Sequence, residues 1–330
     1  MRLCKNGCPD NCRTPGAGPA PGTSSAEHHP ALKIGICLPY MKAGLTREDY
    51  LAWFRGIDQG PFHSLSCGER IHGPSFDMRV VLSAAAMATE RVQITPTLYV
   101  LPMHSATRVA KEVATLDILS GGRVRQIAVG YGGREQDYEA VGAPFRGRYG
   151  RMDHQVDALR RVWRGEEVVP GCGPVGPAPT SSPRILAGAL GPRSIARCAR
   201  WADGLYAWSG NGEREELARS FALADAAWEQ AGRDQPPYRL GGFWFTLADD
   251  GRKKLYDYVY EYLAIAGPDI ASAMAGAMQR SSPDAVAEAL DNAEAAGCEE
   301  LFLVPATAEL AELERLVELL SKRGYSGTGA

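Results

Sequence analysis

Residues 116–163 constrain the fold of this chain more than any other stretch. They contain, in order, a helix end, a tight link at 120–123, an apolar run over 124–129, a glycine-rich loop and a new amphipathic helix. A nearly continuous apolar run of this length is typical of a strand buried on both faces of a parallel sheet. Helix, strand, loop and helix together form the repeating unit of an α/β protein.

The rest of the chain repeats this unit. Strand-like runs are expected at 34–38, 64–67, 92–98, 124–129, 184–187, 204–207, 240–246 and 301–304. Helical patterns lie between them at 46–58, 78–89, 106–119, 147–164, 192–201, 213–231, 253–296 in pieces, and 308–322. Eight βα units in about 290 residues is the size of one (β/α)8 TIM barrel, which is the predicted fold for residues 32–325.

Residues typical of helix starts and helix ends support these boundaries. Asp77 and Ser282 precede helical patterns, and Pro283 suits a first helical turn. Gly297 and Gly324 follow helical patterns as stop signals.

Residues 1–31 differ from the rest of the chain. They are rich in Pro, Gly, Ala and Ser, so they cannot bury enough apolar surface to offset the entropy of ordering, and a disordered tail is predicted. A short C-terminal tail is expected at 326–330. Cys4, Cys8 and Cys12 recur every fourth residue, which leaves open a metal site or a tail without function. The spacing is not typical of zinc, so no metal site is predicted.

Composition narrows the function classes. The formal net charge of -3 gives no basic surface for nucleic acid. No apolar run approaches the ~20 residues that span a bilayer, and a cytoplasmic protein is expected. Five further cysteines sit singly, mostly within apolar runs, and are expected to be buried free thiols: Cys37, Cys67, Cys172, Cys198 and Cys298.

The organising stretch also carries a resemblance. The pattern LD-x-LS-GGR, a strand that ends in VG-x-G, an acidic-aromatic segment that leads to G-x-P-F-x-x-R, and a helix that ends in Leu-x-x-x-Trp are similar to the bacterial luciferase-like family. This resemblance implies a (β/α)8 barrel that uses FMN as a monooxygenase cofactor or coenzyme F420 as a hydride carrier. It also implies a homodimer formed through barrel helices, for which the apolar helix at 80–87 is a candidate face.

Candidate catalytic groups follow the carboxyl ends of the expected strands. Glu69 and Arg70 follow the second strand, where the resemblance implies an acid followed by a histidine, so Arg70 takes the histidine's place at the cofactor. His72 is a more remote substitute. His104, beyond the third strand, is the histidine expected beside the cofactor ring, and Tyr131 is a third candidate proton donor. A rim ion pair or a solvated loop histidine remains an alternative for these residues.

The cofactor site is expected from the same strand ends. The resemblance implies a non-prolyl cis bond between Thr97 and Leu98 that backs the ring. Glycines can admit a ligand close to the backbone, and a glycine-led helix start can bind a phosphate. The expected cofactor residues, besides Arg70, are Thr97, Leu98, Gly130, Tyr131, Gly132, Arg148, Leu190, Gly191 and Ser194.

Other stretches allow two interpretations each. The Pro/Gly-rich segment 169–183 either shapes the substrate pocket or is a surface loop without a role. Tyr258 and Tyr262 share a helical face that either packs on the barrel or forms an aromatic wall at the substrate, and packing is the default. Trp208 either stands beside the ring or caps the core.

Three functions are compatible with this sequence. The leading hypothesis is an F420-dependent oxidoreductase that transfers hydride to a C=C, C=N or C=O group of a small or peptide substrate. The Arg70 replacement and the short glycine-rich turn favour it over an FMN-dependent monooxygenase. Gly133, where some F420-dependent relatives have a catalytic glutamate, argues against a sugar-phosphate dehydrogenase. The third hypothesis is a barrel that binds flavin without turnover.

Overall fold

Parallel strands form the centre of the protein. The computed structural model describes residues 32–327, and the expectations for residues 1–31 lie outside that range. The strands are β1 (Lys33–Cys37), β2 (Ser64–Cys67), β3 (Gln93–Pro96), β4 (Tyr99–Val100), β5 (Gln126–Gly130), β6 (Arg184–Gly188), β7 (Gly204–Trp208), β8 (Tyr238–Phe245) and β9 (Glu300–Pro305). All paired neighbours in this sheet run parallel, and the order is β3-β2-β1-β9-β8-β7-β6-β5-β4.

The two ends of this ladder, β3 and β4, are consecutive in the chain. The sequence predicted one strand over 92–98, but Thr97 and Leu98 interrupt it. Pro96 has no N–H to donate, which weakens a continuing ladder. As a result β3 pairs only with β2, and β4 pairs only with β5. Counted as one interrupted strand, β3 and β4 complete the predicted eight-stranded barrel.

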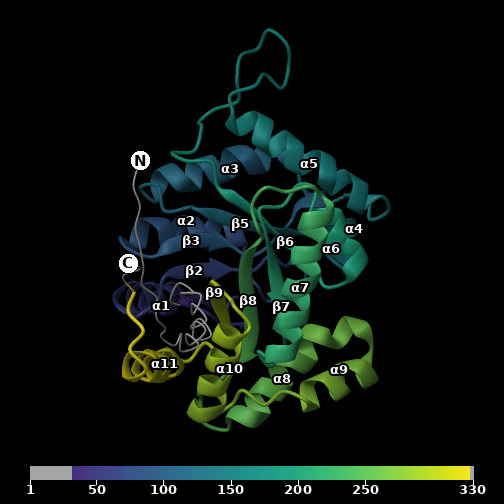
Figure 1. Ribbon diagram of the computed structural model, residues 1–330. Helices are drawn as coiled ribbons and strands as arrows, with labels where there is room; N and C mark the ends of the chain where they lie inside the picture. Colours follow the sequence, from purple (N-terminus) through teal and green to yellow (C-terminus); the bar gives the residue numbers. More distant parts are fainter. Residues whose placement is uncertain (1–31, 328–330) are drawn as a thin grey trace, which may run out of the picture. The chain divides into compact units, whose positions relative to one another are not determined.

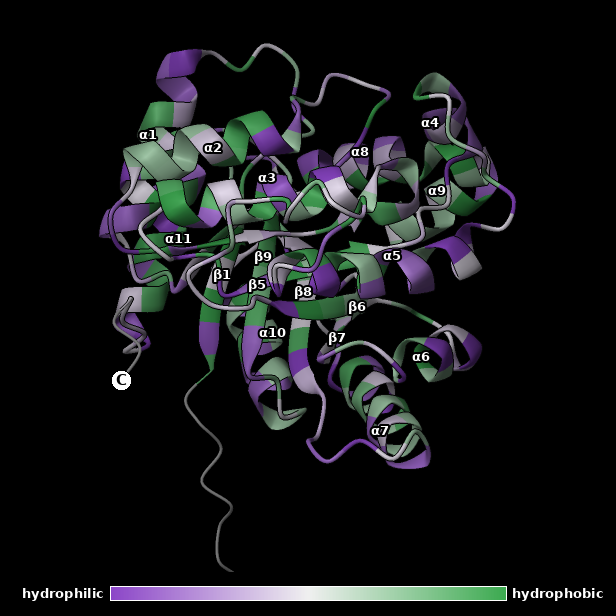
Figure 2. Cartoon of the chain, turned by 90° about the horizontal axis from the view of Figure 1, so that it is seen from above, coloured by the Kyte–Doolittle hydropathy of each residue, from purple (hydrophilic) through white to green (hydrophobic). Residues whose placement is uncertain are grey.

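Helices encircle the strands (Figure 1). They are α1 (Arg47–Gln59), α2 (Met78–Ala88), α3 (Ala106–Leu119), α4 (Glu135–Ala140), α5 (Arg148–Trp163), α6 (Pro192–Cys198), α7 (Arg214–Gln230), α8 (Gly251–Leu263), α9 (Pro268–Gly276), α10 (Pro283–Ala295) and α11 (Leu310–Lys322), with short 3-10 turns at Leu101–Met103 and Ala264–Ala266. Most helices mix hydrophobic and hydrophilic residues, as amphipathic helices on a barrel do (Figure 2). No helix within 32–327 is long and apolar enough to cross a membrane.

The residues predicted to begin and end helices are found at helix ends. The Asp77 carboxylate accepts hydrogen bonds from two backbone N–H groups at the start of α2, and the Ser282 hydroxyl caps α10. Gly297 and Gly324 have φ of 77° and 81°, the left-handed conformation that favours glycine after a helix.

Two layers of apolar side chains hold the barrel together. The larger fills the space between the strands and the helices. The smaller contains strand residues alone and occupies the barrel interior: Ala128, Leu186, Tyr206, Tyr238, Leu240 and Phe302. Because Phe302 and Tyr206 fill the centre, the barrel is a packed core, and a ligand site has to lie at one of its ends.

The LD-x-LS-GGR motif links α3 to β5 through hydrogen bonds of its side chains. The buried Asp117 carboxylate accepts hydrogen bonds from the Val124 N–H at 3.2 Å and from both the N–H and the hydroxyl of Thr180 at 2.7 Å. The Arg123 guanidinium donates to several backbone carbonyl groups, among them that of Ser120 at 2.6 Å. The motif therefore ties the segment that precedes β6 to the helix that precedes β5.

Candidate active site

A cavity of about 610 Å³ lies at the carboxyl ends of the barrel strands. This volume is within the range of cofactor and small-molecule sites, and the carboxyl end is where barrel enzymes carry their active sites. Every residue predicted for the site lines the cavity except His104 and the remote candidate His72, namely Glu69, Arg70, Thr97, Leu98, Gly130, Tyr131, Gly132, Arg148, Leu190, Gly191 and Ser194. The strand-end argument therefore brings together residues from widely separated parts of the chain.

The back of the cavity is formed by Leu98 between two glycines. The Thr97–Leu98 peptide bond is cis, as predicted. Gly130 and Gly188 are register partners on β5 and β6, and a Cβ atom on either would lie 2.9 Å or 2.6 Å from a methyl carbon of Leu98. Only glycine leaves room for this side chain, so the two strand ends and Leu98 form one close-packed surface.

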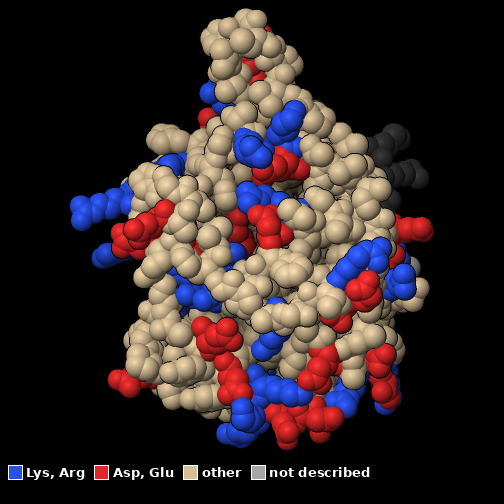
Figure 3. Space-filling model, turned by 180° about the vertical axis from the view of Figure 1, so that it is seen from behind, with Lys and Arg blue, Asp and Glu red and all other residues tan. Residues whose placement is uncertain are grey.

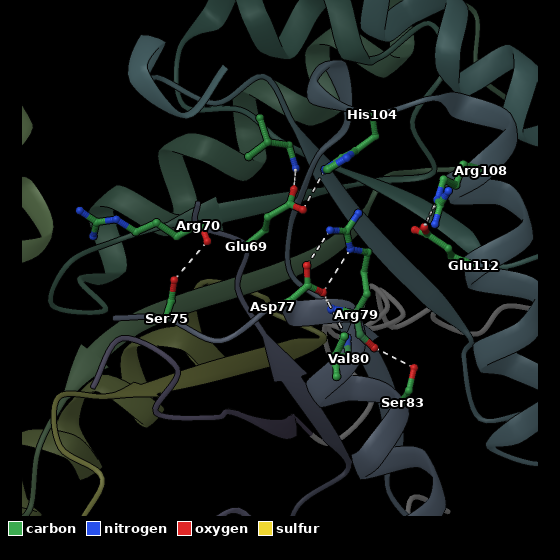
Figure 4. A network of polar contacts seen from close by, with 11 residues as sticks. Glu69, Arg70, Ser75, Asp77, Arg79, Val80, Ser83, His104, Arg108 and Glu112 are labelled. Atoms are coloured by element: carbon green, nitrogen blue, oxygen red, sulfur yellow. Dashed lines mark hydrogen bonds and ion pairs between the residues drawn. The ribbon is translucent and has the colours of Figure 1, made fainter. Parts of the chain in front are cut away.

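Glu69 and His104 form a buried acid–histidine pair at the cavity wall. The Glu69 Oε1 atom lies 2.8 Å from His104 Nε2, and Oε2 accepts a hydrogen bond from the Val100 N–H at 2.7 Å. The side chains of Glu69 and His104 are 4% and 11% exposed. Figure 4 shows them pointing toward each other, while Arg70 extends in another direction. The sequence placed His104 beside the cofactor ring, whereas the structure places it behind Glu69, because its ring turns back from the loop after β4 to meet the carboxylate.

His72 does not replace the missing histidine. Its Nδ1 atom lies 2.6 Å from the Asp137 carboxylate, and its backbone N–H donates to the same oxygen at 3.2 Å. Its side chain is 56% exposed, and it does not line the cavity, whereas Asp137 does.

The Tyr131 hydroxyl is directed to α6. It lies 3.1 Å from the Cys198 sulfur, and the ring packs 4.5 Å from the ring of Tyr149. Burial, and to a smaller degree Cys198, raises the pKa of Tyr131 well above its usual range, so the phenol is protonated at neutral pH. Either group can donate in this hydrogen bond, and burial raises the pKa of the Cys198 thiol to about 11.

Arg148 is a half-buried cation on the cavity wall. Its guanidinium lies 3.7 Å from the ring centre of Phe145 and 4.7 Å from that of Tyr149. Its Nε donates to the Gly132 carbonyl at 3.3 Å. Across the same part of the cavity, the Ser194 hydroxyl caps the start of α6 through the backbone of Gly191. The Arg148 guanidinium is a suitable donor for a phosphate, whereas the Ser194 hydroxyl donates its proton to the Gly191 carbonyl at 2.8 Å.

An aromatic wall lines another side of the cavity. It consists of Tyr206, Trp208, Trp244 and Tyr262, whose consecutive ring centres lie 4.7 to 6.4 Å apart. This assigns Trp208 to the cavity. It also divides the predicted tyrosine pair, because Tyr262 lines the cavity while Tyr258 is buried beside it in the core.

A family model described as luciferase-like monooxygenase matches residues 32–327, which is the whole of the described chain. The chain belongs to the luciferase-like monooxygenase family. An uncharacterized protein of Mycobacterium tuberculosis (strain H37Rv) is 31% identical over 230 residues, which cover 65% of this chain and 76% of that protein.

Solved structures agree on the fold of this luciferase-like chain. The monooxygenase RslO1 from Streptomyces bottropensis is 25% identical with a TM-score of 0.69, and the match covers 88% of this chain and 98% of that one. An F420-dependent secondary alcohol dehydrogenase in complex with an F420-acetone adduct is 16% identical, with a TM-score of 0.73 and the same coverage. The latter identity supports the fold alone.

Arg134 and Trp244 are among the cavity residues of this family member that the sequence did not identify. Arg134 follows the glycine-rich loop after β5, and Trp244 lies near the carboxyl end of β8. Their positions at strand ends were the available signal. Arg134 lies beyond the three glycines on which the prediction concentrated, and Trp244 reads as one more apolar residue in a buried strand.

The Pro/Gly-rich segment 169–183 lies at the other end of the barrel, so the interpretation that it shapes the substrate pocket is wrong. Ser181 and Ser182 border a second cavity of about 280 Å³, at the amino ends of the strands. There the buried Glu300 carboxylate accepts hydrogen bonds from Gln126 at 2.7 Å and Tyr238 at 3.1 Å. The segment connects a helix to the following strand, and such connections lie opposite the active-site end.

The cysteine expectation holds with one exception. Cys37, Cys67, Cys198 and Cys298 are buried free thiols, but Cys172 is exposed because it lies in that same surface segment. Within residues 32–327, no group of three or more His, Cys, Asp or Glu residues lies close enough together to hold a metal ion.

Proposed function

We propose that this chain is an F420-dependent oxidoreductase that transfers hydride to a C=O, C=N or C=C group of a small or peptide substrate. The observation that carries the proposal is the buried Glu69–His104 pair at the wall of a cofactor-sized cavity. Hydride addition to such a group leaves a negative charge on oxygen, nitrogen or carbon, and the product requires a proton.

The cavity fits a flat, phosphate-bearing cofactor. Leu98, Gly130 and Gly188 provide a surface against which a planar ring can lie, because no Cβ atom projects from either strand end. Arg148 makes no ion pair within 4 Å with a carboxylate of residues 32–327, so its charge is available for a phosphate. A reduced deazaflavin held there by these residues would supply the hydride.

The residues of this chain position the reactants and move the proton. The aromatic wall of Tyr206, Trp208, Trp244 and Tyr262 excludes water from the side of the cavity where the substrate lies. Glu69 in its acid form donates a proton from Oε1 to the reduced group. The Glu69 carboxylate that remains accepts a hydrogen bond from the Nε2–H of a neutral His104, and a proton from solvent restores the acid form after each reaction. The Val100 N–H keeps the other oxygen, Oε2, in place.

Binding titrations of the purified full-length protein with F420 and with FMN test this proposal. We expect micromolar affinity for F420 from the change in its fluorescence, weaker binding of FMN, and about a tenfold loss of F420 affinity in Arg148→Gln, since a charge-assisted contact is lost. Arg252→Gln, an exposed arginine on α8, is the matched control. Exclusive binding of FMN would reject F420. Tight F420 binding with no hydride transfer to any carbonyl, imine or alkene tested would support a barrel that binds without turnover.

One observation favours a second candidate. RslO1, which is 25% identical and has the highest identity of the two solved structures compared above, is described as a monooxygenase. An FMN-dependent monooxygenase would use the same ring surface and the same phosphate donors. Preference for FMN together with oxygen consumption by the reduced complex would assign the chain to this candidate.

A further inference from the structure

Two arginines share one aromatic ring of the cavity. The guanidinium carbons of Arg70 and Arg134 lie 5.8 Å and 5.6 Å from the ring centre of Tyr262. Arg134 also donates a hydrogen bond from Nη2 to the Tyr262 carbonyl. Arg70 comes from the loop after β2, Arg134 from the loop after β5, and Tyr262 from the end of α8, so three distant elements meet at this point. We call these three residues the arginine clasp.

The two positive charges of the clasp have no carboxylate in direct contact. Neither arginine makes an ion pair within 4 Å with any carboxylate of residues 32–327. Burial, and next the neighbouring charge of Arg70, lowers the pKa of Arg134. Two guanidinium groups that repel each other in a partly desolvated cavity are unfavourable until an anion joins them.

Arg70 also has unused hydrogen-bonding capacity. Its Nε atom is buried and has no hydrogen-bond partner in the described chain. Its Nη1 atom contacts the Met41 sulfur at 3.6 Å, and a thioether is a weak acceptor. A buried donor without a partner costs free energy, so it is normally satisfied by a ligand or by water.

The nearby carboxylates are engaged elsewhere. Glu69 is bound by His104 and by the Val100 N–H, and Asp137 is bound by the ring and the N–H of His72. Asp137 offsets part of the charge of Arg134 from a distance, but neither carboxylate lies within 4 Å of either guanidinium. A bound anion in direct contact would supply the remaining negative charge.

The clasp also continues the aromatic wall. Tyr262 packs 5.3 Å from Trp244, which packs 4.7 Å from Trp208. A molecule with a charged group at the clasp would lay its remaining atoms along these indole rings, which favour a flat apolar body. Arg148, which is assigned to the cofactor phosphate, belongs to a different aromatic group with Phe145 and Tyr149.

We propose that the substrate is a flat apolar carboxylic acid, whose carboxylate is bound by Arg70 and Arg134 and whose body lies along Tyr262, Trp244 and Trp208. This inference deepens the proposed function by naming the substrate class of the same site. It reassigns Arg70 from the cofactor to the substrate. The guanidinium groups also explain why an arginine is useful at position 70, where the resemblance implies a histidine.

Benzoate and benzamide are matched probes for this inference. They have the same shape, and only benzoate carries the charge. In the full-length protein without cofactor, followed by tryptophan fluorescence, we expect benzoate to bind about tenfold more tightly than benzamide. Arg70→Met should remove most of this preference, and Arg70→Met with Arg134→Gln should remove all of it. Arg252→Gln should retain it.

Arg70→Met is the cleaner variant, because the Nε that it removes holds no other group of the protein. Circular dichroism establishes that each variant is folded.

Several outcomes would overturn the inference. These are equal binding of the two probes, no binding of either, and a benzoate preference that survives the double substitution. Coenzyme F420 carries carboxylates of its own, so its affinity is measured in the same variants. A loss of F420 affinity without a loss of FMN affinity would assign the clasp to the cofactor and reject the substrate role. The probe measurement needs no cofactor and no turnover, so it can succeed even if the F420 proposal fails.

Discussion

At the scale of single residues, Glu69 combines two tasks. One carboxylate oxygen faces His104, and the other holds the backbone of β4 through Val100. A substitution that deletes the side chain would disturb both tasks, so a test of its chemistry has to keep an acceptor for the Val100 N–H.

Glu69→Gln meets that requirement. We expect turnover to fall by about a hundredfold or more, because an amide cannot donate a carboxylic proton, while cofactor affinity stays near the wild-type value. Steady-state kinetics and fluorescence titration measure the two quantities. Unchanged turnover would remove Glu69 from the chemistry and leave it with the structural task alone.

Gly188→Ala tests the surface behind the cofactor. The new Cβ would lie 2.6 Å from a Leu98 methyl carbon, and that flexible side chain would move into the cavity. We expect about a tenfold loss of cofactor affinity, and a smaller loss of stability because Leu98 has somewhere to go. The control is Gly276→Ala on α9, where an added Cβ meets nothing within 4 Å. Equal affinities in the two variants would contradict the packing argument.

Sequence patterns predicted which residues lie at the site better than they predicted where each side chain points. Glu69, Gly130 and Arg148 were found because carboxyl ends of parallel strands converge, whatever the side chains do. The direction in which His104 or Tyr131 points depends on partners such as Glu69 and Cys198, which are distant in sequence. The arginine clasp was missed for the same reason.

At the scale of elements, the buried carboxylate of Asp117 links α3 to the residues just before β5 and to the segment before β6. Asp117→Ala would leave three donors, two of them on Thr180, without their acceptor. We expect a loss of about 3 kcal/mol in the free energy of unfolding, measured in urea. Asp157→Ala, an exposed aspartate on α5, is the control and should change it by less than about 0.5 kcal/mol.

Helix α11 carries a buried acid that links stability to pH. Burial raises the pKa of Glu312 from 4.5 to about 7, although the hydroxyls of Thr246 and Thr307 donate to its Oε2 and oppose the shift. The folded state therefore holds a proton that the unfolded state releases above pH 4.5. Its contribution is complete below that pH and is lost as pH rises toward 7, by about 3 kcal/mol in total. Urea unfolding at several pH values should show a flatter profile for Glu312→Gln, and an identical profile would contradict the assignment.

Elements with strong periodicity were predicted correctly, and those governed by pairing were not. The strands and most helices follow from apolar patterns alone. The break between β3 and β4 and the position of segment 169–183 depend on which strands become neighbours, and that information is not local. The short helix α4 was also missed, since its six residues are too few to show a periodic pattern.

At the scale of the whole molecule, charged and apolar side chains are distributed differently over the surface. Positive and negative side chains are interspersed over the face in Figure 3. The outer side of α2, in contrast, exposes Val80 and Met87 at 69% each, and the neighbouring α3 ends with Ile118 and Leu119 about half exposed. Exposed apolar residues that cluster on adjacent helices are typical of a protein interface.

We propose that two copies of the chain associate through this face of α2 and α3. Val80→Glu with Met87→Glu should convert a dimer into a monomer in light scattering, because a buried charge without a partner opposes association. Val168→Glu with Val169→Glu, in the loop at the other end of the barrel, should leave the mass unchanged. A wild-type protein that is monomeric at all concentrations would reject the proposal.

The interruption between β3 and β4 has a practical consequence. The barrel closes through Thr97 and Leu98, and these same residues form the back of the cavity. A molecule bound there would contact the place where the barrel closes and would stabilise it, whether or not it reacts. Binding and the stability of the fold are then coupled, because a ligand that binds only the closed barrel stabilises the folded state. Slower amide exchange at that place would reveal an occupant before any substrate is known, and the same occupant would lengthen storage life.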